Sequence, residues 1–138
     1  MELHRGNATP TARGREGWFQ GVVWIDRIVQ APAPARVRAY RVAFEPGART
    51  AWHAHPLGQT LHGVWGLGLV QSRGGTPRLI RPGDAAWIPP GEEHWHGAVP
   101  DAAMVHLAIH EAGEDGSETA WLEQVTDADH RAAAAGAS

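Results

Sequence analysis

The chain has 138 residues, a length typical of one domain, and 43% of them are hydrophobic, which is enough for a buried core. The formal net charge of −3 and the lack of basic runs argue against nucleic acid as a partner. The absence of cysteine excludes disulfides and thiolate metal sites. A polar start at residues 1–6 and no long apolar run predict a cytoplasmic protein with no membrane partner.

Most of the chain predicts β-strands, because aromatic and β-branched residues recur in short runs between glycines and prolines. We expect strands at residues 18–29, 37–45, 49–55, 59–72, 78–80, 85–89, 104–111 and 119–125. Thr126 and Asp129 resemble a capping box ahead of an alanine-rich run, which predicts a short C-terminal helix that stops at Gly136.

Many short strands with Gly/Pro turns predict an all-β sandwich or barrel, and a barrel of this size can hold one small ligand inside. We expect one domain over 1–138. Its core lies at about 36–111, with an N-terminal strand at 18–29 and a C-terminal strand and helix at 119–135.

Histidine is the most informative residue type, because seven of the nine copies lie between His53 and His110. On a strand, His53 and His55 point to the same face, and Gln59 can return beside them after the turn at residues 56–58. A neighbouring strand would supply His94, with His96 two residues further on. Imidazole nitrogens and an amide oxygen arranged in this way predict a metal site.

The strand at 104–111 places Met104, His106, Ala108 and His110 on one face and aliphatic residues on the other. The face with two histidines suits a polar pocket. In the strand at 37–45, Tyr40, Val42 and Phe44 likewise share one face.

Other prominent residues have structural explanations. His62 is out of phase with Gln59 and is expected to face away from the metal, while His4 and His130 are expected to be solvated. Trp52 and Trp95 neighbour ligands, point the opposite way and are expected to pack. A solvated outer face is expected for the arginines Arg41, Arg49, Arg78 and Arg81.

Two spaced motifs resemble those of the cupin superfamily. The first motif, G-x5-H-x-H-x3-E-x6-G, matches from Gly47 through His53, His55 and Gln59 to Gly66, with glutamine replacing glutamate. The second, G-x5-P-x-G-x2-H-x3-N, matches from Gly83 through Pro89, Gly91 and His94, with Ala98 at its last position. The resemblance implies a cupin β-barrel, the jelly roll or double-stranded β-helix, and does not by itself define the reaction.

The stretches at 44–61, 90–98 and 104–111 are similar to small bacterial cupins that act as manganese-dependent hydroxynitrile lyases. This resemblance implies metal ligands at His53, His55, Gln59 and His94, and a catalytic base at His106. The substrate-pocket positions that it implies are Tyr40, Val42, Thr50, His96 and His110. It also implies a small-molecule substrate, a divalent ion with Mn²⁺ favoured, and a homodimer or homotetramer.

Three neutral histidines and a neutral amide would leave the charge of a divalent ion uncompensated, which favours Lewis-acid chemistry on a cyanohydrin. The same ligands accept Fe²⁺, Zn²⁺, Co²⁺ or Ni²⁺. Two alternatives stay open at this point: a metal-dependent dioxygenase that cleaves enols or alkenes, and a non-catalytic barrel that binds a metal or small ligand.

Overall fold

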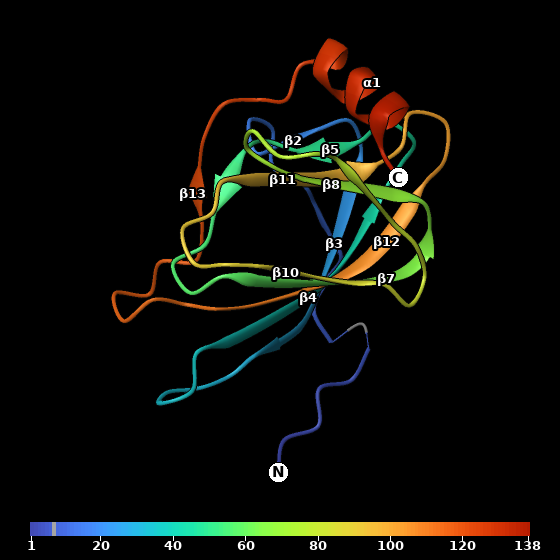
Figure 1. Cartoon of the computed structure of the whole chain (residues 1–138). Coiled ribbons are helices and arrows are strands. Elements are labelled where there is room, and N and C mark those ends of the chain that lie inside the picture. Colours follow the sequence, from blue (N-terminus) through green and yellow to red (C-terminus); the bar gives the residue numbers. More distant parts are fainter. Residues whose placement is uncertain (7) are drawn as a thin grey trace.

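In the computed structural model of the chain, which describes residues 1–6 and 8–138, short strands form two sheets that face each other (Figure 1). The strands are β1 (Ala12–Arg13), β2 (Phe19–Gln20), β3 (Val23–Gln30), β4 (Val37–Phe44), β5 (Arg49–Thr50), β6 (His53–Ala54), β7 (Gln59–Gly66), β8 (Gly68–Ser72), β9 (Arg78–Ile80), β10 (Ala85–Ile88), β11 (His94–Ala98), β12 (Met104–Glu111) and β13 (Ala120–Trp121). The predicted all-β barrel is confirmed.

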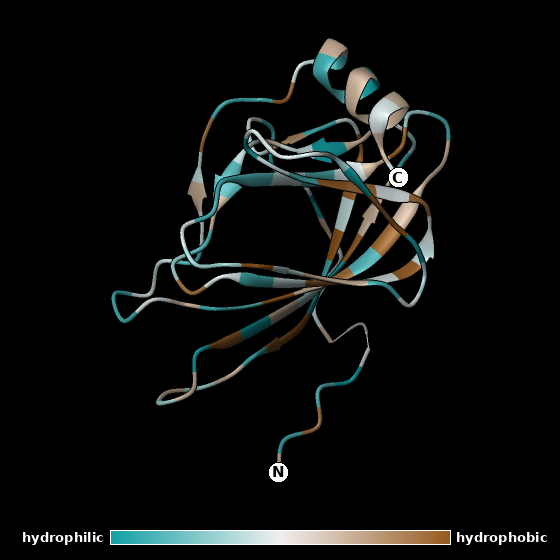
Figure 2. Ribbon diagram, viewed as in Figure 1, coloured by the Kyte–Doolittle hydropathy of each residue, from teal (hydrophilic) through white to brown (hydrophobic). Residues whose placement is uncertain are grey.

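One sheet has six strands in the order β1-β3-β4-β12-β7-β10, and the other follows β13-β6-β11-β5-β2 with β8 and β9 attached through β11. The strands named above pair with one another in antiparallel fashion, as in a jelly roll. In Figure 2 hydrophobic and hydrophilic residues alternate along the strands.

The core fills the space between the sheets. Val42, Phe44, Leu61, Met104 and Ala108 are buried there in one cluster. They come from β4, β7 and β12, which are adjacent in the six-stranded sheet. Because neighbouring strands are in register, the residues of each inner face line up across the sheet and form one continuous wall.

Glycines divide two segments that the sequence predicts as single strands. The strand expected at 18–29 is two strands, β2 and β3, because Gly21 turns the chain at φ +75°. The stretch at 59–72 divides into β7 and β8 at Gly66, where φ is +78° and a Cβ atom would lie 2.0 Å from the carbonyl oxygen of Ala103.

Three more local predictions need correction. The segment 49–55 forms two short strands, β5 and β6. The strand β11, which carries His94, is missing from the strand ranges expected above. At the C-terminus only Ala120–Trp121 of the segment 119–125 is strand.

The expected C-terminal helix is confirmed as α1 (Asp127–Gly136), and the side chain of Thr126 accepts a hydrogen bond from the backbone N–H of Asp129 at 3.1 Å. Figure 1 shows α1 lying across the sheet that contains β8 and β11. A second apolar cluster, with Trp95, Val125 and Ala133, fills the space beneath it, so the predicted packing role of Trp95 is confirmed.

Two polar residues that were expected in solvent are instead buried beside α1. His130 is 3% exposed, and its Nε2 atom donates to the carbonyl oxygen of Ala98 at 2.9 Å. Arg49 is 4% exposed and donates to the carbonyl oxygen of Val125 and the carboxylate of Asp127. The docked helix therefore covers both side chains.

Within residues 1–6 and 8–138, no helix has both the length and the apolar character needed to span a membrane.

Candidate active site

Three short segments bring the predicted metal ligands together inside the barrel. His53 belongs to β6, His94 opens β11, and these two residues are paired across the strands. His55 follows β6, and Gln59 opens β7 after the turn at Gly58. All four side chains are buried, at 4% exposure or less. The turn returns Gln59 to the face shared by His53 and His55, as the sequence predicts.

Backbone carbonyl oxygens orient the three predicted histidine ligands. Nδ1 of His53 donates to the carbonyl oxygen of Ala51 at 2.9 Å. In the same way, Nδ1 of His55 donates to Glu118 at 2.7 Å, and Nδ1 of His94 donates to Glu92 at 2.9 Å. Since a carbonyl can only accept, each Nδ1 carries the proton of the neutral ring. Each Nε2 then has a free lone pair, which is the arrangement that metal-binding histidines use.

Two of these acceptors face each other. Nε2 of His94 lies 3.1 Å from Oε1 of Gln59. Both atoms carry lone pairs, so this contact is repulsive unless a cation lies beside them or the amide group rotates. Nε2 of His55 is buried and has no hydrogen-bond partner among the described residues. These three lone-pair atoms without a hydrogen-bond donor therefore fit a bound cation.

A three-histidine group of His53, His94 and His96 has one ring nitrogen from each residue within 4.8 Å of the others. This group contains two of the predicted ligands and replaces His55 with His96. The ring of His55 is also close, with its centroid 5.1 Å from that of His53. Histidine nitrogens thus surround one point in the barrel from several strands.

Burial keeps these rings neutral. It lowers the pKa of His55 to about 4, and it holds the pKa of His53 well below its usual value, with the neighbouring His94 and His55 adding to the effect. The pKa of His94 is also lowered, again mainly by burial. Neutral imidazole is the form that binds metal, so the site needs no loss of protons near neutral pH.

The predicted base His106 lies behind His96. Its Nε2 atom is 3.0 Å from Nδ1 of His96, and both rings are buried. His96 borders the cavity described next, whereas His106 does not. Among the residues that the structure describes, Nε2 of His96 has no hydrogen-bond partner and is free to meet a ligand. Burial lowers the pKa of His106 to about 4.

A cavity of about 400 Å³ opens beside the histidines. All five predicted pocket residues border it: Tyr40, Val42, Thr50, His96 and His110. The predicted ligands His53, His55 and Gln59 border it as well. The volume lies within the range of small-molecule sites, so the cavity can hold a substrate next to the histidine cluster.

An aromatic wall that the sequence did not assign to the site closes one side of the cavity. Trp18 stacks on Trp121 with centroids 5.1 Å apart, and Phe19 lies 5.6 Å from Trp121. The ring of Trp121 is 4.9 Å from that of His53. Trp121 reaches the site because β13 pairs with β6, and this long-range pairing leaves no local signal in the sequence.

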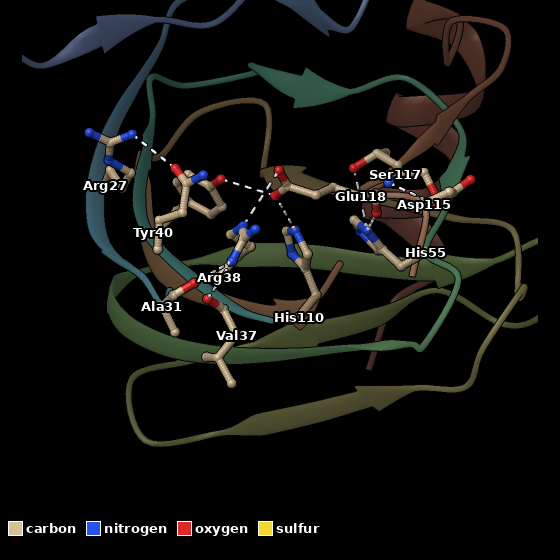
Figure 3. A network of polar contacts seen from close by, with 12 residues as sticks. Arg27, Ala31, Val37, Arg38, Tyr40, His55, His110, Asp115, Ser117 and Glu118 are labelled. Atoms are coloured by element: carbon tan, nitrogen blue, oxygen red, sulfur yellow. Dashed lines mark hydrogen bonds and ion pairs between the residues drawn. The ribbon is translucent and has the colours of Figure 1, made fainter. Parts of the chain in front are cut away.

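Glu118 is a further site residue that sequence reasoning missed, because an acidic stretch rich in glycine ordinarily indicates an exposed loop. Its Oε1 atom accepts from Tyr40 Oη at 3.1 Å and from His110 Nε2 at 3.0 Å (Figure 3). Burial, together with Glu118, raises the pKa of Tyr40 to about 12 and keeps its hydroxyl protonated. His110 stacks on the ring of His55 at 4.6 Å, which joins this network to the predicted ligands.

The fold and the histidine cluster are those of a cupin, and the model of the cupin domain matches residues 40–110. The chain therefore belongs to the cupin family. The matched region begins in β4 and ends in β12, so it contains the predicted ligands and most of the cavity wall.

Among known proteins, the chain is similar to an (R)-mandelonitrile lyase from Granulicella tundricola, with 52% identity over 131 residues, which cover 95% of this chain and 99% of that relative. A crystal structure of a cupin-like protein from Thermotoga maritima matches with a TM-score of 0.85 and 38% identity, over 96% of this chain and 99% of the other. The polyketide cyclase RemF from Streptomyces resistomycificus matches with a TM-score of 0.74, over 100% of this chain and 99% of that one. At 15% identity it supports the fold alone.

Proposed function

We propose that this cupin is a metal-dependent hydroxynitrile lyase that splits cyanohydrins into an aldehyde and cyanide and also catalyses the reverse addition. The 52% identity with a curated (R)-mandelonitrile lyase over 95% of the chain supports a lyase activity. The observation that carries the proposal is the pair of facing acceptors, Nε2 of His94 and Oε1 of Gln59, next to the unpartnered Nε2 of His55 at a small-molecule cavity.

The residues present fit a divalent ion, held by His53, His55, His94 and Gln59. Bound there, the ion would act as a Lewis acid on the cyanohydrin hydroxyl and make it more acidic. His96 is within reach as a further nitrogen donor or as the nearest proton acceptor. We favour manganese, and iron, zinc, cobalt and nickel fit the same ligands.

The protein's own residues account for the proton transfer. His96 presents an unpartnered Nε2 at the cavity, and Nδ1 of the same ring contacts His106. This pair takes the proton of the substrate hydroxyl, with His106 acting through His96. The oxygen then forms the aldehyde C=O bond as the bond to cyanide breaks, and cyanide takes a proton from the same pair. The wall of Trp18, Phe19 and Trp121 excludes water and holds an aryl group.

We also propose a homodimer or homotetramer in the cytoplasm. Trp65 is 61% exposed and Trp87 is 63% exposed, and both lie in β7 and β10 at one edge of the six-stranded sheet. Large exposed aromatic side chains on one edge of a sheet support contact with a second copy of the chain.

The direct test is mandelonitrile cleavage by protein loaded with Mn²⁺, followed as benzaldehyde release by absorbance. Cleavage well above the rate of buffer with free Mn²⁺ is expected, with loss of activity in chelated protein and in His94→Ala. His62→Ala is the matched control, because His62 lies in β7 and does not border the cavity. The proposal fails if the loaded protein cleaves no faster than His94→Ala. Oxygen consumption by the iron-loaded protein, with an enol substrate, would instead indicate a dioxygenase.

A further inference from the structure

We propose that Glu118 is a specificity-determining residue and that its carboxylate selects aryl substrates with a hydrogen-bond donor on the ring, such as a phenolic hydroxyl. This inference rests on the proposed function, because it assigns the far end of the same cavity to the aryl substituent. Glu118 is the only carboxylate among the described residues that border the cavity. Its side chain is 32% exposed, so it is within reach of a ligand.

The two oxygens of this carboxylate have different surroundings. Oε1 accepts from both Tyr40 and His110, and these two bonds fix the position of the group. Among the residues that the structure describes, none donates a hydrogen bond to Oε2. Nε of Arg38 is 3.8 Å from Oε2, which is an ion pair beyond hydrogen-bond distance. Oε2 therefore keeps lone pairs for a ligand.

Figure 3 shows the contacts that hold the carboxylate of Glu118 in place. Tyr40 and Arg38 come from β4 and His110 comes from β12, and the carboxylate of Glu118 reaches over from the loop before β13 to meet all three. The backbone carbonyl oxygen of the same residue accepts the hydrogen bond from His55 at 2.7 Å. Glu118 is thus tied to the predicted metal ligands through its backbone and to the pocket wall through its side chain.

The spacing suits a substituted aryl ring. The rings of His55 and His110 stack at 4.6 Å, and His110 Nε2 lies 3.0 Å from the carboxylate. A substrate that reacts beside His55 and lies along His110 would bring the far edge of its ring to Glu118, because one imidazole separates the two positions. The wall of Trp18, Phe19 and Trp121 provides the apolar contact for the ring itself.

The chemistry of the group then sets the preference. A phenolic hydroxyl or an aromatic N–H donates to the carboxylate, whereas an ether oxygen in the same place meets a negative charge that it cannot pair with. An anionic substituent would be repelled. The cavity should therefore rank hydroxyl-substituted rings above methoxy-substituted rings, although both substituents push electrons into the ring.

The experiment compares 3- and 4-hydroxymandelonitrile with the matching methoxy compounds, using protein loaded with Mn²⁺. In the unmodified protein we expect kcat/KM for the better hydroxy isomer to exceed that of its methoxy partner by about tenfold. This ratio should fall close to one in Glu118→Leu and to an intermediate value in Glu118→Gln, which keeps one acceptor oxygen. Glu114→Leu is the matched control from the same loop and should keep the full ratio, because the side chain of Glu114 is 93% exposed.

The affinities of 4-hydroxy- and 4-methoxybenzaldehyde, measured by calorimetry, give a second readout that needs no turnover. The same order of affinity in the unmodified protein, reduced in Glu118→Gln and lost in Glu118→Leu, supports the assignment even if no cyanohydrin is cleaved. Absent cleavage would then count against the proposed function alone. Equal affinities and equal rates in the unmodified protein would overturn the inference. So would a preference that persists in Glu118→Leu, because that result indicates exclusion by size.

Discussion

Nε2 of His106 and Nδ1 of His96 lie 3.0 Å apart inside the barrel, and both rings are buried. One nitrogen must donate to the other, so the protonation of each ring fixes the tautomer of its neighbour. Phe44 packs against both rings, with its centroid 5.3 Å from that of His106 and 6.0 Å from that of His96, and so restrains the pair. The two imidazoles therefore behave as one unit, and only His96 borders the cavity.

The first prediction follows from this coupling. His106→Ala and His96→Ala should each lower kcat for mandelonitrile cleavage by about 10²- to 10⁴-fold, the range typical of a lost acid–base group. The double variant should be little worse than either single one, because residues that act as a unit are not additive. Steady-state kinetics on the three metal-loaded proteins provide the check. Strictly multiplicative losses would show that the two rings act separately.

The second prediction concerns Gln59, which stands where the cupin motif has glutamate. Gln59→Glu should bind Mn²⁺ more tightly, by about tenfold or more, because a carboxylate adds a favourable charge interaction. It should also lower kcat, since the bound ion becomes a weaker Lewis acid. Metal content after dialysis against a graded series of chelator concentrations measures the first effect, and turnover measures the second. Weaker retention of the metal by the variant would contradict a ligand role for position 59.

Strand periodicity predicts which residues of the inner wall share a face, and the resemblance to the small lyase-like cupins implies that they line the pocket. His53 and His55 share a face, as do Tyr40 and Val42 in β4, and all four border the cavity. Similarly, the buried positions of β12 alternate in the way the sequence indicates. These predictions need only the two-residue repeat of an extended chain.

Residues whose position depends on distant segments could not be predicted in this way. Glu118 enters the site because its loop folds back over β4 and β12, and an acidic run rich in glycine usually indicates solvent exposure. Trp121 depends on the pairing of β13 with β6. Arg49 and His130 are buried by the docking of α1, which local sequence does not specify. In each case tertiary packing overrides a correct local preference.

A third prediction is the pH dependence of stability in the metal-free protein. The pKa of His106 is lowered to about 4 by burial, against an ordinary value of 6.5, so the unfolded chain binds this proton at a higher pH than the folded one. The free energy of unfolding therefore keeps its full value above pH 6.5. It falls as the pH drops from 6.5 toward 4, by up to about 1.4 kcal/mol per pH unit for this group.

Urea unfolding at a series of pH values tests this prediction. His106→Asn should show a shallower loss of unfolding free energy between pH 6.5 and pH 4 than the unmodified protein. His4→Asn is the matched control, because the side chain of His4 is 48% exposed and lies in the N-terminal segment. Equal slopes in His106→Asn and the unmodified protein would mean that folding does not lower the pKa of His106.

The last prediction concerns the buried guanidinium that holds α1. Arg49 donates from Nε and Nη2 to the carbonyl oxygen of Val125, at 3.0 and 2.7 Å, and from Nη2 to Asp127 at 2.7 Å. Arg49→Met keeps much of the aliphatic packing but leaves that carbonyl group without its donor, so it should lower the free energy of unfolding by about 1–3 kcal/mol. The ion pair with Asp127 should add little, because that carboxylate is 72% exposed.

Arg41→Met provides the matched control for Arg49→Met. The side chain of Arg41 is 48% exposed and, within the described part of the chain, pairs only with Asp26 at 3.4 Å. Its replacement should therefore change the free energy of unfolding by no more than about 0.5 kcal/mol. Chemical denaturation of the two variants measures the difference, and proteolysis near residue 126 reports whether α1 detaches first. Equal stability of Arg49→Met and Arg41→Met would show that α1 is held by the apolar cluster around Trp95 instead of by Arg49.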